Sequence, residues 1–167
     1  MPNSTLHNSL VQKSKYKLVV LYLLAIFACK PEFTLDHAPP SDKVPVAQVF
    51  PSEIMGQKAK LQKIVGKNGV LGFAADYGTN NRIEVYQIIS KQEKEAVQYF
   101  EKQILPFFKK QESHYSKKIG GKPAAYAKDK QDRLYYAWVN QNWIFHLMGN
   151  SSKEMQAIVK KFSYISD

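Results

Sequence analysis

Hydrophobic and polar positions alternate in short runs along the C-terminal two thirds of the chain. Runs of apolar and β-branched residues bounded by Gly, Asn or charged turns are typical of strands. Six segments fit this pattern, at 58–65, 69–77, 82–89, 122–129, 133–139 and 143–149. The tight turns "GTNN" and "NQN" predict two antiparallel hairpins, one from the second and third segments and one from the fifth and sixth.

Helical spacing replaces this alternation after residue 90. Ser90 and Glu93 have the spacing of a capping box, so a helix is expected to begin there. Pro106 should kink or end its regular part, because proline removes a backbone donor. The apolar stripe of this helix consists of Ala96, Val97, Phe100, Ile104, Phe107 and Phe108.

A second helix is expected at the end of the chain. Ser151 and Glu154 repeat the capping pattern, and an apolar stripe follows at Met155, Ile158, Val159 and Phe162. An offset of 61 residues aligns the two hairpin–helix segments, for example Ser90 with Ser151. Two strand–strand–helix repeats are one interpretation, and coincidence is the other, since such segments are common.

These elements predict one α+β domain over 52–167. Its antiparallel sheet would have about six strands, with both helices on one face. The final hairpin is apolar on both faces, whereas a sheet covered on one side carries polar residues on the other. Three interpretations are open: a buried central hairpin, which the sequence favours, a self-association surface, or an aromatic ligand or partner surface around Tyr135, Trp143 and Phe145.

The longest apolar run lies near the N-terminus, from Leu18 to Ala28. It is too short to cross a bilayer comfortably, since a spanning helix needs about 20 apolar residues. Lys13, Lys15 and Lys17 precede it, and residues 1–28 contain no acid. This arrangement is typical of a signal peptide.

The end of this run, "IFAC", resembles the lipobox of bacterial lipoproteins. Ile26, Ala28 and Cys29 match that pattern, and Phe27 is larger than the residue usual there. The resemblance implies transfer of a diacylglyceryl group to the Cys29 thiol, cleavage after Ala28 and acylation of the new amine, with fatty acids such as palmitate. It implies a cell-envelope protein anchored to a bacterial membrane and facing away from the cytoplasm. An uncleaved anchor and a buried helix are the alternatives.

The domain organisation follows from this resemblance. Residues 1–28 would be the signal, 29–51 a tether that begins at the lipidated Cys29, and 52–167 the folded domain. Five prolines between residues 30 and 51 favour an extended tether over a helix.

The chain is strongly basic, with 24 Lys and Arg against 14 Asp and Glu, a net charge of +10. Only Arg82 and Arg133 are arginines, whereas specific nucleic-acid readers use arginine for bidentate base contacts. Nucleic acid is therefore not an expected partner. A lysine-rich surface favours solubility first and affinity for anionic lipids or wall polymers second.

The sequence contains no recognised catalytic, metal-binding or cofactor motif, so no cofactor and no metal are expected. Asp129 and Asp132 are expected in a solvated turn rather than a cation site. Asp76 and Glu84 could pair with Arg82, with no reason for a tuned pKa.

Two functions are expected from these features, and a third possibility is that the domain is a structural spacer with no ligand. The first is a non-catalytic envelope module that binds a protein or an apolar ligand. The second is a small, hydrolase-like envelope enzyme, for which His114, His146 and Tyr136 are the candidate residues. Convergence of the two histidines with a carboxylate in a pocket would favour the enzyme, and an open aromatic face would favour the binding module.

Overall fold

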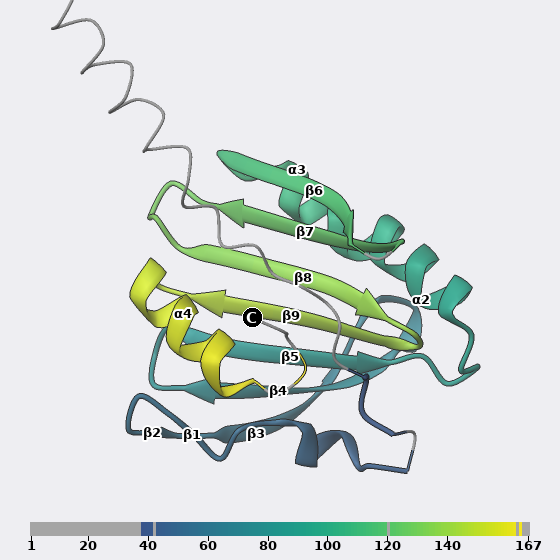
Figure 1. Ribbon diagram of the computed structural model, residues 1–167, viewed down its shortest axis with the longest axis horizontal. Helices are drawn as coiled ribbons and strands as arrows, with labels where there is room; N and C mark the ends of the chain where they lie inside the picture. The colour runs from purple at the N-terminus through teal and green to yellow at the C-terminus, as the bar shows by residue number, and fades with distance from the viewer. Residues whose placement is uncertain (1–37, 42, 120, 163, 165–167) are drawn as a thin grey trace, which may run out of the picture. The chain divides into compact units, whose positions relative to one another are not determined.

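An open seven-stranded antiparallel sheet forms the centre of the protein in the computed structural model, which describes residues 38–41, 43–119, 121–162 and 164 (Figure 1). The strands follow the order β3-β4-β5-β9-β8-β7-β6. Their bounds are Lys60–Val65 (β3), Leu71–Tyr77 (β4), Asn81–Gln87 (β5), Ser113–Ile119 (β6), Lys122–Lys128 (β7), Leu134–Asn140 (β8) and Trp143–Gly149 (β9). The α+β class predicted from the sequence is confirmed.

The sheet has one strand more than the six expected. The additional strand is β6, whose mostly polar sequence "SHYSKKI" gives no apolar alternation because it lies at the edge and stays largely exposed. A separate two-stranded sheet pairs β1 (Glu53–Ile54) with β2 (Gln57–Lys58).

The central hairpin β8–β9 is buried on both faces. Every residue of β8 is buried, and in β9 only His146 and Met148 are partly exposed. This confirms the interpretation that the sequence favoured, a buried hairpin. It also corrects the expected aromatic surface, because Trp143 and Phe145 are fully buried on one face whereas Tyr135 lies on the other.

The two helical regions cover opposite faces of the sheet, not one face as expected. Helix α4 (Ser152–Lys161) packs on the face that carries Trp138 and Phe145, here called the α4 face. Helix α2 (Glu93–Tyr99), the π-helix η3 (Phe100–Ile104) and helix α3 (Leu105–Lys109) pack on the α2–α3 face, which carries Ala137 and Ile144. Figure 1 shows α4 in front of the sheet and α2 and α3 behind it. A hairpin that is apolar on both faces needs cover on both.

The two strand–strand–helix units have opposite hand. Strands β5 and β9 are antiparallel neighbours, and β4 and β8 flank them on opposite sides. Compared with the unit β4–β5–α2, the unit β8–β9–α4 has its strands in the opposite direction and in the opposite order across the sheet. Its helix also lies on the opposite face. No rotation superimposes the two units, so the similarity at an offset of 61 does not mark a repeated structural unit.

The two helix starts differ. At α4 the N-cap at Ser151 is confirmed, since its side chain accepts a hydrogen bond from the backbone N–H of Glu154 at 3.3 Å, whereas Glu154 Oε2 is buried without a hydrogen-bond partner. At α2 the prediction is wrong, because Gln92 is the N-cap and the Ser90 hydroxyl instead donates to Glu95 Oε2 at 2.6 Å. The first helix is also interrupted before Pro106, because the π-helix η3 separates α2 from α3.

The predicted tether is too long at its C-terminal end. Val46–Val49 form a 3-10 helix, η1, and Val49 is buried in the core of the α4 face. The Tyr77 hydroxyl donates to the Pro51 carbonyl at 2.7 Å, which ties this segment to β4. These residues belong to the domain because their apolar side chains pack in or against its hydrophobic core.

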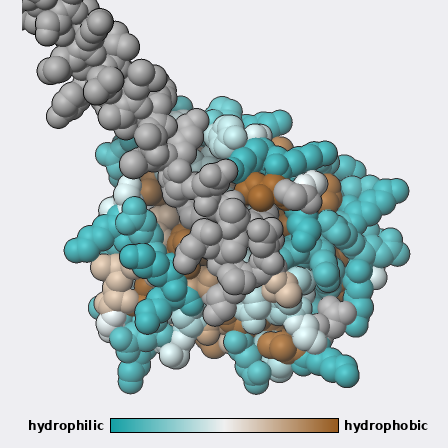
Figure 2. All heavy atoms as spheres, in the orientation of Figure 1, coloured by the Kyte–Doolittle hydropathy of each residue, from teal (hydrophilic) through white to brown (hydrophobic). Residues whose placement is uncertain are grey.

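Hydrophilic side chains cover much of the visible surface of the domain, with hydrophobic patches between them (Figure 2). Within the part of the chain that the structure describes, none of the helices has the length and apolar character needed to cross a bilayer.

Gly149 sets the distance between β9 and α4. A Cβ at this position would lie 2.9 Å from the backbone nitrogen of Met155, closer than real side chains approach. We expect Gly149→Ala to lower the free energy of unfolding by about 1–3 kcal/mol, because the first turn of α4 must shift. Urea unfolding measures this. Ser152→Ala, an exposed change in the same turn, is the control, and equal stabilities of the two variants would contradict the close approach.

Candidate functional site

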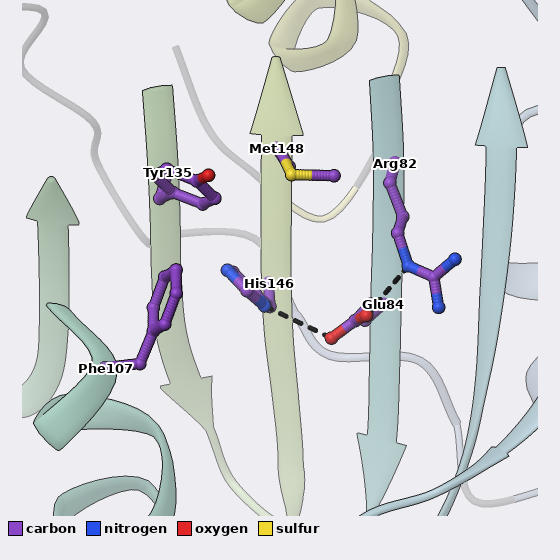
Figure 3. A pocket seen from close by; sticks show the side chains of 6 residues that line it. All are labelled: Arg82, Glu84, Phe107, Tyr135, His146 and Met148. Carbon is purple, nitrogen blue, oxygen red and sulfur yellow. Dashed lines mark hydrogen bonds and ion pairs between the residues drawn. The ribbon is translucent and has the colours of Figure 1, made fainter. Parts of the chain in front are cut away.

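A pocket of about 200 Å³ opens on the α2–α3 face, over strands β5, β9 and β8 and beside α3 (Figure 3). Its lining combines charged and aromatic side chains, namely Arg82, Glu84, Phe107, Tyr135, His146 and Met148. Figure 3 shows His146 in the middle, with the charged residues of β5 on one side and the two aromatic rings on the other.

Strand register brings these residues to one face. Glu84 of β5 lies directly opposite His146 of β9, and Met148 of β9 lies between Arg82 on one side and Tyr135 of β8 on the other. Side chains alternate between the faces of a strand, so these positions point the same way. The charged residues Arg82 and Glu84 lie in β5, and β9 separates this strand from the apolar strand β8.

Arg82 joins two carboxylates at the charged end of the pocket. Its Nη1 donates to Asp76 Oδ1 and its Nε donates to Glu84 Oε1, both at 2.8 Å. The side chains of Arg82 and Glu84 are only 23% and 20% exposed, so this pair is shielded more than a surface ion pair. The pairing expected from the sequence is confirmed.

Glu84 accepts hydrogen bonds at both oxygens. Besides Arg82, His146 Nδ1 lies 3.2 Å from Glu84 Oε2, and the Tyr86 hydroxyl donates to the same oxygen at 3.0 Å. Burial alone would raise the pKa of Glu84, but the hydrogen bond and charge of His146, followed by those of Arg82, lower it to about 2. The expectation that nothing tunes a pKa here was therefore wrong.

Three aromatic rings surround the imidazole of His146. Tyr135 stacks on it at a centroid distance of 6.2 Å, and Phe107 and Phe108 approach it at 6.0 and 5.6 Å. Phe107 and Phe108 belong to α3, which begins directly after η3 and carries Pro106 in its first turn. Extra π-helical turns of this kind often occur at functional sites.

Tyr135 is held in place from the turn before β8. Its hydroxyl donates to Asp129 Oδ2 at 3.0 Å, and Arg133 Nε donates to the same oxygen at 2.7 Å. Asp129 is buried, whereas a solvated turn was expected. Asp132 pairs with Lys128 instead, so the two aspartates do not form a cation site together.

One nitrogen of His146 has no partner. Its Nε2 is buried and makes no hydrogen bond, although its Nδ1 is bonded to Glu84. An ionised carboxylate only accepts, so Nδ1 must donate, and in a neutral imidazole this leaves a lone pair on Nε2. A carboxylate that orients an imidazole in this way can create either a hydrogen-bond acceptor for a ligand or a general base.

The other candidate catalytic residues do not join this site. His114 lies on the edge strand β6, two strands beyond β8, and Tyr136 is buried on the α4 face. The sequence does not predict that Glu84 lies beside His146, because the two residues belong to different hairpins. A weak signal was present at His146, which interrupts an otherwise apolar strand.

Cys29 lies outside the described residues, and its lipidation stays a prediction. Across the described part of the chain, no group of three or more His, Cys, Asp and Glu is arranged to hold a metal ion.

Comparison with known proteins supports the fold only. No protein-family model matches the chain, and no curated protein matches it. A solved GTP binding regulator from Thermotoga maritima is similar in structure, with a TM-score of 0.53 and 14% sequence identity over 78% of this chain and 96% of that chain. At this identity the likeness shows a shared fold and not a shared ligand.

The low pKa of Glu84 predicts acid sensitivity. A carboxyl group whose pKa is lowered by folding stabilises the protein above its unfolded pKa, near 4.5, and this contribution is lost as the pH falls toward about 2. Between these values we expect the parent to lose on the order of 2–3 kcal/mol more stability than Glu84→Gln, which has no charge to lose. Urea unfolding at several pH values measures the difference.

Tyr86→Phe is the matched control. It removes one hydrogen bond to Glu84 but keeps the carboxylate with Arg82 and His146, so it should retain the pH dependence of the parent. If the free energy of unfolding falls equally with pH in the parent and in Glu84→Gln, then Glu84 has the same pKa in the folded and the unfolded chain. That result would contradict the prediction.

Proposed function

We propose that this protein is a lipid-anchored module of the bacterial cell envelope that binds a small, largely apolar ligand in the pocket between α3 and the sheet. The observation that carries the binding function is the buried, unpartnered Nε2 of His146 beside an aromatic-lined pocket. A buried polar atom without a partner costs about 1–3 kcal/mol, so a ligand group that bonds to it gains affinity.

The pocket fits a small ligand. A cavity of about 150 Å³ lined by apolar side chains accepts a benzene ring, and this pocket has about 200 Å³. Phe107, Tyr135 and Met148 supply the apolar contact, and a few polar groups beside them fix orientation, as in most ligand sites.

The envelope location rests on the lipobox resemblance at Cys29. Several acyl chains on one residue would give stable membrane attachment. The lysine-rich domain would add attraction to anionic lipid head groups or wall polymers.

A hydrolase-like enzyme is the alternative, and the Glu84–His146 pair favours it. An imidazole oriented by a carboxylate is the arrangement of a general base. Binding is preferred because the six residues lining the pocket include no Ser, Thr or Cys that such a base would activate.

The lipid anchor is tested by the mass of the N-terminal peptide of the membrane-extracted protein. We expect an acyl-modified Cys29 as the first residue, and a Cys29→Ala variant that keeps residues 1–28 and is not acylated. An unmodified Cys29 still preceded by Ala28 would exclude the lipoprotein assignment.

The binding function is tested by titrating the full-length protein in detergent with toluene, phenol, benzoate and benzylamine. We expect at least one probe to shift the NMR signals of His146 and Tyr135 but not those of His114. Met148→Trp fills the pocket and should abolish the shifts. Met55→Trp makes the same change at an exposed position outside the pocket, so it should preserve the shifts. This variant controls for loss of probe by partitioning into the detergent. Absence of shifts with all four probes would refute the binding function.

A further inference from the structure

The carboxylate and the tyrosine hydroxyl of the pocket lining have hydrogen-bond partners, whereas Nε2 of His146 has none. Both oxygens of Glu84 accept hydrogen bonds, from Arg82 at Oε1 and from Tyr86 and His146 at Oε2. The Tyr135 hydroxyl is bonded to Asp129. A ligand therefore gains most affinity by forming a hydrogen bond with Nε2 of His146, the atom that has no partner.

The charges around the pocket disfavour an ionic ligand. An anion would lie near the ionised Glu84 and Asp76, and the positive charge of Arg82 is already paired with both carboxylates. A cation would lie near the positive charge of Arg82, and both oxygens of Glu84 already accept hydrogen bonds. Removing a charged group from water without a partner is costly, so an uncharged ligand is favoured.

The hydrogen-bond direction at Nε2 selects the polar group of that ligand. Glu84 accepts hydrogen bonds from Arg82 at Oε1 and from Tyr86 at Oε2, as an ionised carboxylate does, so Nδ1 of His146 donates to it. When the ring is neutral, Nε2 is then an acceptor, so the ligand that this form of the ring binds supplies an O–H or N–H donor.

Phe107 provides access to this atom. Among the three rings around His146, Phe108 is 1% exposed and Tyr135 is 5% exposed, whereas Phe107 is 39% exposed. Figure 3 shows the nitrogen of His146 that faces away from Glu84 directed toward the side of Phe107 and Tyr135. A ligand that approaches Nε2 from the side of Phe107 would therefore displace the most exposed of the three rings.

We infer that the pocket takes an uncharged aromatic alcohol, whose ring packs against Phe107 and Tyr135 and whose hydroxyl donates to Nε2 of His146. This inference rests on the proposed binding function and names the class of its ligand. The ring packs on the apolar walls, and the hydroxyl bonds to Nε2 of His146, a buried polar atom of the pocket lining that has no hydrogen-bond partner.

The test compares phenol with toluene, which lacks the hydroxyl, and with anisole, which keeps the oxygen but has no donor. In the full-length protein we expect phenol to bind roughly tenfold tighter than either, the gain of one net hydrogen bond. Phenol should also bind more tightly than benzoate and benzylamine. The nitrogen signals of His146 in the phenol complex should show a proton on Nδ1 and an unprotonated Nε2.

Two variants isolate the acceptor. His146→Phe keeps an aromatic ring but has no acceptor, so phenol should lose its advantage over toluene. Glu84→Gln presents its amide N–H to Nδ1 while its oxygen faces Arg82, which moves the imidazole proton to Nε2 and should also remove the advantage.

Equal affinities for phenol, anisole and toluene would overturn the inference but leave the binding function intact. Tighter binding of an ionic probe, or a protonated Nε2 in the phenol complex, would overturn it as well. Failure of every probe to bind would instead refute the binding function on which the inference depends.

Discussion

The need to cover an apolar hairpin on both faces determines the arrangement of this domain. Strands β8 and β9 carry large apolar side chains at successive positions, so neither face can meet water without a large loss of hydrophobic stabilisation. Helix α4 covers one face and the α2–α3 segment the other. The central place of the hairpin follows, because β5 and β7 then shield its two sides.

The pocket exists because this cover is incomplete. The α2–α3 segment packs tightly on β8, but toward β5 the same face carries Arg82 and Glu84, which a helix cannot bury without partners. The charged residues pair with each other and with His146, and the aromatic residues of α3 stop beside them. The pocket therefore lies where the apolar and the charged parts of this face meet, and it offers a ligand both apolar and polar contacts.

Much of the fold was predictable, because turns, alternation and the cap at Ser151 are local signals. The edge strand β6 was not, since an exposed strand needs no apolar pattern. The hairpin that is apolar on both faces favours helices on opposite faces, but the helix patterns themselves do not specify which face each helix covers. The site was only partly predictable: Arg82 pairs with Asp76 and Glu84 within one hairpin, whereas Glu84 meets His146 across 62 residues of sequence, through a strand pairing that no local pattern specifies.

The two outer strands of the sheet have a consequence for how copies of this protein meet. An edge strand offers hydrogen-bonding groups to any other strand, which makes open sheets prone to joining edge to edge. Here β3 carries Lys60 and Lys63, and β6 carries Lys117 and Lys118. Two such edges brought together would place ammonium groups side by side, so the sheet resists growing beyond a single chain even where the protein is crowded.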